Sequence, residues 1–144
     1  MSVVIEIVRA VTDELVEAFD RLLPQLSRSA PTLDAKALRR LIDWPGNHVL
    51  VARADGRIVG TLTLVTFPIP TGLRAWIEDV VVDEEARGLG VGAALTTEAV
   101  RLARTAGART VDLTSRPARE AANRLYERLG FKVRDSKVFR LSHQ

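Results

Sequence analysis

The chain of 144 residues contains no cysteine. Disulfide bonds, cysteine-based metal sites and a cysteine nucleophile are therefore excluded. Histidine is scarce as well, because only His48 and His143 occur and they lie far apart in the sequence, so no metal site is expected. Aromatic residues make up only 5% of the chain, and the basic residues are scattered. Nucleic acid is therefore not an expected partner.

Long hydrophobic runs are absent too, so the sequence predicts no membrane span. The first residues, SVVIEIV, include an acidic residue and lack a basic leading segment, unlike a signal peptide. A cytoplasmic location is the resulting prediction. The net charge of +3 is mild and suits an anionic ligand. Length and an ordinary 47% of hydrophobic residues predict one domain over residues 1–144.

Hydrophobic periodicity predicts strands and helices in a mixed order along the chain. Asp34 is a suitable helix cap, Pro24 should kink or end the first helix, and Asp55-Gly56 is a strong hairpin signal. The segment 67–74, rich in proline, is expected to be a loop that closes over a substrate. The predicted strands are 3–9, 48–54, 57–66, 75–82, 109–114, 131–134 and 137–141, and the predicted helices are 12–28, 35–43, 91–106 and 117–129. This order predicts a mixed α/β (α+β) fold with helices on both faces of one central, mostly antiparallel sheet of about seven strands.

The most informative stretch is IEDVVVDEEARGLGVG, residues 77–92, in which an apolar strand and an acidic turn precede a glycine-rich segment and a helix. Glycines let backbone amides approach a ligand, and a helix N-terminus adds unpaired N–H groups and partial positive charge. Together they indicate a site for phosphate or pyrophosphate. The alternative is a glycine-rich helix start that binds no ligand.

Three phosphate-binding patterns compete for this stretch. The nucleoside-triphosphate loop is excluded because no lysine follows the glycines. The dinucleotide pattern fits Gly88, Gly90 and Ala93, with Asp112 downstream, but a charged segment separates those glycines from the strand. The third pattern, R-x-x-G-x-G, is met by Arg87 and the glycines that follow. In this pattern the chain resembles the acyl-CoA loop of the GNAT superfamily of N-acetyltransferases.

A second block, residues 119–131, resembles a later motif of the same superfamily, N-x-x-Y-x-x-x-G-F. Its Asn123 and Tyr126 lie three positions apart and share a helix face. The resemblance implies that Asn123 binds the pantetheine or phosphate region and that the hydroxyl of Tyr126 lies near the cofactor sulfur, where it protonates the leaving thiolate. A core-edge tyrosine with a surface asparagine is the structural alternative. The resemblance implies acetyl-CoA as co-substrate, without a metal, and these cofactor-binding residues: Val80, Val81, Val82, Arg87, Gly88, Leu89, Gly90, Val91, Gly92, Asn123 and Tyr126.

Two adjacent carboxylates, Glu78 and Asp79, interrupt the apolar strand and are costly to bury without a partner. Successive strand residues point to opposite faces, so only one of them is expected to face a substrate. By position Glu78 resembles the acidic base of many GNAT enzymes, with pairing to an arginine or binding of a substrate ammonium as the alternative. The family also implies a β-bulge here that frees a backbone N–H for the oxyanion, assigned by position to Val81.

Weaker candidates complete the site. Trp44, Trp76 and Phe67 could line an acceptor pocket or pack in the core, and residues 83–85 are expected to form a solvated turn. Taken together, the resemblance implies a GNAT fold and an enzyme that moves an acetyl group from acetyl-CoA to a primary amine by direct attack, with Glu78 and Tyr126 catalytic. The acceptor is a small-molecule or protein amine, and a homodimer is an open alternative. A non-catalytic acyl-CoA-binding or regulatory module, and a transferase of another acyl group, are the competing readings.

Overall fold

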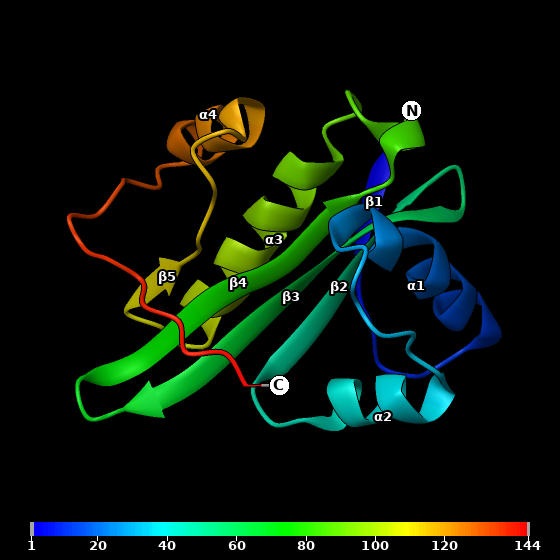
Figure 1. Cartoon of the computed structure of the whole chain (residues 1–144), viewed down its shortest axis with the longest axis horizontal. Coiled ribbons are helices and arrows are strands. Elements are labelled where there is room, and N and C mark those ends of the chain that lie inside the picture. Colours follow the sequence, from blue (N-terminus) through cyan, green and yellow to red (C-terminus); the bar gives the residue numbers. More distant parts are fainter. Residues whose placement is uncertain (1, 144) are drawn as a thin grey trace. The chain divides into compact units, whose positions relative to one another are not determined.

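The computed structural model describes residues 2–143 and shows strands and helices in a mixed order (Figure 1). The elements are β1 (Val3–Ile7), α1 (Asp13–Leu26), α2 (Ala35–Asp43), β2 (Asn47–Ala54), β3 (Arg57–Ile69), β4 (Gly72–Val82), the short 3₁₀ helix η1 (Glu84–Ala86), α3 (Val91–Thr105), β5 (Thr110–Asp112) and α4 (Glu120–Arg128). The chain divides into two compact units, residues 1–114 and residues 115–144. The first holds the sheet with α1, α2 and α3, and the second holds α4.

The sheet of the first unit has the strand order β1-β2-β3-β4-β5. Neighbours from β1 to β4 are antiparallel, whereas β5 pairs with β4 in parallel. The mixed, mostly antiparallel sheet is therefore confirmed, but the prediction of about seven strands is wrong for the described residues, which form five. Residues 131–134 and 137–141 adopt no strand, although their sequence alternates. Four of their apolar side chains are exposed, so burial does not favour the strand pairing that the alternating pattern predicts: Val133, Val138, Phe139 and Leu141.

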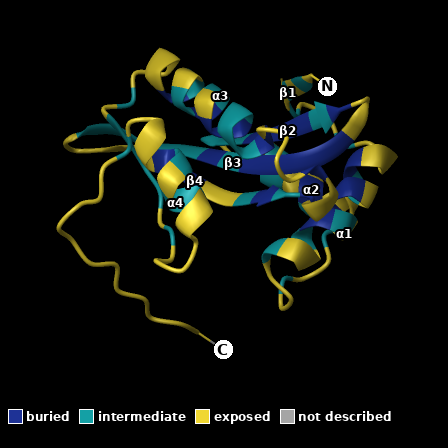
Figure 2. Cartoon of the chain, turned by 90° about the horizontal axis from the view of Figure 1, so that it is seen from above, coloured by how far each residue is buried: buried dark blue, intermediate teal, exposed yellow. Residues whose placement is uncertain are grey.

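Helices cover both faces of the sheet in this unit, with α1 and α2 on one face and α3 on the other (Figure 2). The α1 face holds a cluster in which Leu15, Phe19 and Leu22 of α1 pack with Val49 and Val51 of β2. Leu15, Phe19 and Leu22 recur at helical spacing, as the sequence predicts. Burying such side chains stabilises the unit by about 1.5–3 kcal/mol each before entropy is counted. In residues 2–143, no helix is long and apolar enough to cross a membrane.

Local signals place most element boundaries correctly. Asp34 caps α2 by accepting a hydrogen bond from the backbone N–H of Ala37 at 2.8 Å. Asp55 and Gly56 both have positive φ angles, 52° and 78°, as the tight turn between β2 and β3 requires. Pro24 does not end α1 at once, because it lies in the last turn and the helix closes at Leu26.

Two predicted segments, 67–74 and 117–129, differ clearly from the structure. The segment 67–74 is not a loop, because β3 runs to Ile69 and β4 begins at Gly72, so that the segment is the tip of a long hairpin. β-branched and aromatic neighbours extend the ladder through Pro68, which pairs with Leu73. α4 begins at Glu120, later than the expected start at Pro117.

Candidate active site

The centre of β4 carries a β-bulge. Thr63 of β3 pairs with Glu78, but the next paired positions are Thr61 and Val81, so β4 contains one extra residue at Asp79 and Val80. Asp79 has φ 50°, in the left-handed region that aspartate and asparagine tolerate better than most residues. The bulge implied by the resemblance is therefore present in the fold, directly before Val81.

The bulge changes where the two adjacent carboxylates lie. A regular strand would send Glu78 and Asp79 to opposite faces, and the sequence predicts that only one faces a substrate. Both instead line the same pocket, because the left-handed turn at Asp79 interrupts the alternation. The prediction of opposite faces is wrong for this reason.

This pocket, the candidate acceptor pocket, lies on the face of the sheet that α1 and α2 cover, and it holds about 190 Å³. Its apolar lining comes from Phe19 and Leu23 of α1, Leu33 before α2, Leu41 of α2 and Val65 of β3, and its polar lining consists of Asn47, Thr61, Thr63, Glu78 and Asp79. The alternation TLTLVT in β3 sends both threonine hydroxyls to this face. An apolar cleft with a few convergent polar groups is the usual form of a small-molecule site.

The aromatic candidates lie elsewhere. Trp44, which caps the end of α2, is 63% exposed, and neither Trp76 nor Phe67 is among the residues that line the pocket. The apolar side of the pocket, for which the sequence suggested these three aromatic residues, is formed instead by Phe19 and by leucines of α1 and α2. These residues could not be singled out beforehand because the same apolar spacing also describes core packing.

On its other edge, β4 is paired only along its first half. β5 contacts Arg74, Ala75 and Trp76, and no strand of the described residues pairs with β4 on that edge from Ile77 to Val82. An unpaired stretch of strand offers N–H and C=O groups to an extended ligand. Val80 and Val82 are half-buried there, and Val81 packs into the core beneath α1.

The glycine turn after η1 leads directly into α3. Gly88 and Gly90 have φ angles of 86° and 78°, and a Cβ built on either would meet nothing within 4 Å. The reason for glycine is therefore the left-handed backbone and an open approach, not packing. Gly90 is the N-cap of α3 and supplies no side-chain cap, so the amides of the first turn face outward with their partial positive charge. Such a helix start can accept phosphate oxygens, and Arg87 and Leu89 lie on the exposed turn beside it.

Gly60 of β3 fixes how closely α3 approaches the bulge. A Cβ at this position would lie 2.9 Å from Cγ1 of Val91 and 3.2 Å from the carbonyl oxygen of Val81. Val91 is the first residue of α3 and is buried. The missing side chain therefore lets the positive end of α3 sit against the strand that carries the bulge.

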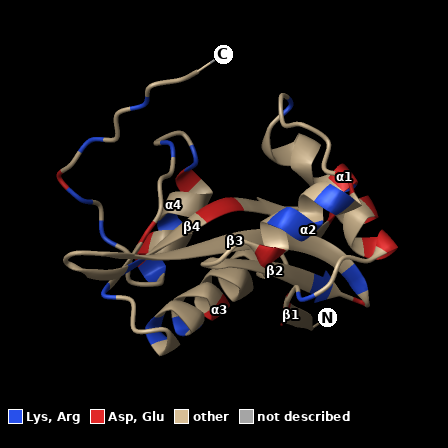
Figure 3. Ribbon diagram, turned by 90° about the horizontal axis from the view of Figure 1, so that it is seen from below, with Lys and Arg blue, Asp and Glu red and all other residues tan. Residues whose placement is uncertain are grey.

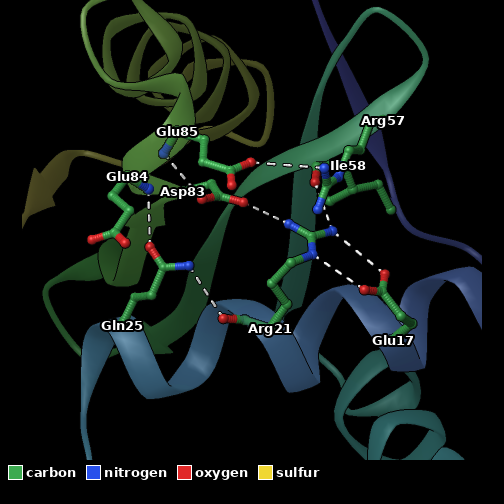
Figure 4. A network of polar contacts seen from close by, with 8 residues as sticks. All are labelled: Glu17, Arg21, Gln25, Arg57, Ile58, Asp83, Glu84 and Glu85. Atoms are coloured by element: carbon green, nitrogen blue, oxygen red, sulfur yellow. Dashed lines mark hydrogen bonds and ion pairs between the residues drawn. The ribbon is translucent and has the colours of Figure 1, made fainter.

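The acidic turn before the glycines is anchored rather than solvated. Asp83 is 3% exposed, and its Oδ2 accepts a hydrogen bond from Nη1 of Arg21 at 2.7 Å. Arg21 also donates to the carbonyl oxygen of Ile58 and to Glu17, while Gln25 accepts from the backbone N–H of Glu84 (Figure 4). The prediction of a solvated turn holds for the exposed Glu84 and is wrong for Asp83. The signal for it is Arg21, the single basic residue of α1.

Hydrogen bonds keep the carboxyl group of Asp83 ionised. Burial alone would raise the pKa of this carboxyl group, but hydrogen bonds from the backbone N–H of Glu85 and from Arg21 outweigh burial and hold the pKa below its ordinary value. The carboxylate is therefore ionised at neutral pH and ties α1 to the start of the glycine turn.

In the second unit, α4 carries the later motif. The side-chain amide of Asn123 donates to the carbonyl oxygen of Arg116 at 3.1 Å, and the ring of Tyr126 packs edge-on against Phe131 with 5.9 Å between centroids. Burial raises the pKa of the Tyr126 phenol, and the positive charge of Arg119 opposes that shift only in part. The phenol therefore stays protonated at neutral pH.

Comparison with known proteins identifies the family. The sequence model described as the Acetyltransferase (GNAT) family matches residues 10–131. The chain belongs to this family. It is accordingly an acetyltransferase, and the glycine turn and the bulged strand lie within the matched residues.

Two curated relatives are similar to this GNAT chain in sequence, and one solved structure is similar to it in fold. It is 35% identical over 117 residues to a glucosamine 6-phosphate N-acetyltransferase of Trypanosoma brucei brucei, covering 76% of this chain and 78% of the relative. It is 36% identical over 114 residues to a mycothiol acetyltransferase of Nocardiopsis dassonvillei, covering 74% of this chain but only 34% of that protein. A crystal structure from Bacillus halodurans described as a transcriptional regulator has a TM-score of 0.82 at 27% identity, covering 99% of this chain and 100% of the other.

Proposed function

We propose that the protein transfers the acetyl group of acetyl-CoA to a primary amine by direct attack, without a covalent enzyme intermediate. The observation that carries this proposal is the bulge in β4. It places Glu78 and Asp79 in the lining of one pocket, on the face that α1 and α2 cover and next to a strand edge that is open from Ile77 to Val82. An amine bound at the carboxylates and an acyl donor bound along the open edge would meet at the bulge.

The residues present fit acetyl-CoA. The turn from Arg87 to Gly92, with its left-handed glycines and the uncapped start of α3, suits the pyrophosphate. The open backbone of Val80, Val81 and Val82 suits the amide groups of an extended pantetheine arm. We assign Leu89, Val91 and Asn123 to the same binding role on the motif positions that they occupy. When bound, acetyl-CoA supplies an acetyl thioester whose leaving group is a thiolate.

Groups of the chain itself would accept and donate the protons of the reaction. A bound ammonium must lose a proton before its nitrogen can attack, and Glu78 in the pocket is the group we assign to accept that proton, directly or through water. The backbone N–H of Val81, beside the bulge, is the donor we assign to the oxygen that becomes negative. Tyr126, neutral at working pH, is assigned to protonate the departing sulfur.

Two measurements test the proposal. Calorimetry should show binding of acetyl-CoA and no binding of NAD, because the competing dinucleotide pattern predicts the reverse. Release of CoA should then depend on an added primary amine, with an N-acetylated product. Binding of acetyl-CoA without turnover of any amine in a broad panel would instead favour a non-catalytic acyl-CoA-binding module. A single-domain organisation and a cytoplasmic location belong to the same proposal.

A further inference from the structure

Two arginines lie at the end of the hairpin that β3 and β4 form, and neither is paired with a carboxylate. Arg74 of β4 is half-buried, and Arg109, which directly precedes β5, is exposed. None of the ion pairs between described residues involves either guanidinium. The acidic stretch of β4 lies further along the strand, away from the hairpin end (Figure 3). The hairpin end therefore carries positive charge that no ion pair of the described residues neutralises.

Both guanidiniums are held by neutral oxygens around Thr71, which lies in the turn between β3 and β4. Arg74 donates from Nη2 to Oγ1 of Thr71 at 2.9 Å and from Nη1 to Oγ1 of Thr110 at 3.2 Å. Arg109 donates from Nη1 to the carbonyl oxygen of Thr71 at 2.6 Å. Because both arginines bind the same residue, their guanidiniums lie close together, and these bonds fix their positions without cancelling their charge.

Gly72 allows the side chain of Arg109 to lie across the turn. A Cβ built on Gly72 would be only 2.6 Å from Cδ of Arg109, and the φ angle of Gly72 is 127°. The backbone N–H of Arg109 also donates to the carbonyl oxygen of Leu73 at 2.8 Å. The apolar stem of Arg109 is thus packed against the turn while its charged end reaches Thr71. The arrangement is held by contacts along the whole side chain.

Several hydrogen-bond donors at this place are left for a ligand. A guanidinium has five N–H groups, and the bonds above use two from Arg74 and one from Arg109. The hydroxyls of Thr71 and Thr110 both accept from Arg74, so each can donate its own hydrogen elsewhere. The planar fork of arginine matches two oxygens of a phosphate or a carboxylate. These donors therefore suit an oxyanion.

The surrounding chain adds little negative charge. Residues 56–77 and 99–111 contain no aspartate or glutamate, and they cover β3, the first half of β4, the last turns of α3 and the start of β5. The first acidic residue on β5 is Asp112, which pairs with Trp76, whereas Thr110 pairs with Arg74. Two strand positions, about 7 Å, separate Asp112 from Thr110. An anion at the two arginines therefore meets more positive than negative charge.

We infer that the end of the hairpin is a binding site for a phosphate or carboxylate group, separate from the candidate acceptor pocket and from the glycine turn. Arg74 and Glu78 lie on the same face of β4, because the ladder with β3 is regular between them. Four strand positions separate the two residues, a distance of about 13 Å. The anionic group belongs either to an acceptor long enough to span this face or to a free anion, and the site itself does not depend on acetyl transfer.

Titration of the full chain with inorganic phosphate, followed by the NMR signals of its backbone amides, tests the site directly. The amides of residues 71–74 and 109–110 should shift together with one affinity, separately from any shifts at residues 88–92. Arg74→Met should weaken the affinity measured at the hairpin end by about tenfold or more, because hydrogen bonds to a charged group are lost. Absence of shifts at the hairpin end of the folded wild type would overturn the inference.

Two further variants separate a built site from general positive charge. Arg40→Met removes an exposed arginine of α2, which packs against β2 and α1, and should leave the affinity at the hairpin end unchanged. Thr110→Val keeps the net charge and a β-branched residue in β5 but removes one hydroxyl, so it should weaken phosphate binding less than Arg74→Met does. An equal loss in Arg40→Met and Arg74→Met would overturn the inference, as would full affinity in a folded Arg74→Met variant.

Two pentapeptides with a free N-terminal amine, which differ only in Glu or Gln at the fifth position, distinguish the two sources of the anion. The fifth residue lies four extended positions from the amine, as Arg74 does from Glu78. A KM that rises in Arg74→Met for the Glu peptide alone assigns the anion to the acceptor and supports the site. Equal KM values for both peptides, with phosphate bound at the hairpin end, support it as a site for a free anion. The phosphate titration needs no turnover, so failure of acetyl transfer would remove the proposed function and leave this site standing.

Discussion

Arg21 of α1 and Asp83, the cap of η1, form an ion pair with 2.7 Å between Nη1 and Oδ2, and only 5% of the Asp83 side chain is exposed. The pair joins the helix that walls the acceptor pocket to the turn that precedes the glycine-rich segment. Removing one partner of such a pair leaves a buried charge without compensation, and that loss is larger than the net value of the pair.

The first prediction is that Arg21→Met lowers the free energy of unfolding by roughly 3 kcal/mol. The control is Arg101→Met, which breaks the exposed pair with Glu98 and should cost about 0–1 kcal/mol. Urea denaturation of the three proteins measures both values. Equal effects of the two substitutions would show that the Arg21–Asp83 pair stabilises the unit no more than a surface pair does.

The second prediction concerns acid stability. The pKa of Asp83 is lower in the folded protein than in the unfolded chain, so its contribution is present above the unfolded value of about 3.9 and is lost as pH falls through the folded value. Asp83→Asn should therefore destabilise the protein at neutral pH and flatten the part of the stability profile below about pH 4. Denaturation curves recorded between neutral pH and pH of about 2 measure this. A wild-type profile that keeps its full acid slope in the variant would assign the slope to other carboxylates.

The third prediction concerns Gly90, which is the N-cap residue of α3 and has a φ angle of 78°. Gly90→Val should weaken acetyl-CoA binding because the side chain blocks backbone approach and strains the turn. Gly90→Asn is the control for backbone conformation, since asparagine tolerates left-handed geometry, and its stability should stay closer to that of the wild type. Calorimetry of acetyl-CoA binding at matched folded fractions measures the effect. Full affinity in Gly90→Val would show that this turn does not hold the pyrophosphate.

The fourth prediction uses the fact that Tyr126 is the only tyrosine. Its ultraviolet tyrosinate absorbance should rise only above the ordinary pKa of about 10, because burial raises the pKa. Tyr126→Phe should lower kcat by roughly tenfold or more if the phenol protonates the leaving sulfur, with little change in acetyl-CoA affinity. An unchanged kcat would leave Tyr126 with only its packing against Phe131.

The fifth prediction concerns Glu78. Proton removal requires an ionised base, so Glu78→Gln should flatten the acid limb of the pH–rate profile and lower the maximal rate by about a hundredfold. Glu84→Gln, in the exposed turn, is the matched control and should leave the profile in place. An acid limb that survives in Glu78→Gln belongs to the substrate amine, and Glu78 would then only position it.

The sequence predicts the framework of this site well because its signals are local. The spacing of Gly88 and Gly90 before a helix, the cap at Asp34 and the turn at Asp55-Gly56 each act through neighbouring residues. What could not be predicted depends on distant partners. The left-handed turn at Asp79, for instance, coincides with an interruption of the pairing between β4 and β3, and both Glu78 and Asp79 line one pocket.

The dependence on distant partners also explains two incorrect predictions, the solvated Asp83 and the two final strands. Asp83 reads as solvated because its partner, Arg21, lies 62 residues away in the sequence. The final strands read as real because alternation alone cannot show whether a neighbouring strand exists, and Phe139 remains 89% exposed. The assigned roles of Glu78 and Tyr126 stay predictions that rest on their motif positions.

The most direct test of acetyl transfer at this pocket follows an isotopically labelled acetyl group from acetyl-CoA. The protein is incubated with labelled acetyl-CoA and pentylamine, and the acetylated amine and the free CoA are quantified by mass spectrometry. The account predicts labelled N-acetyl-pentylamine formed in equal amount to free CoA, with both falling together in Glu78→Gln. Release of CoA with the label in acetate instead of amide, or no release with any primary amine, would contradict it.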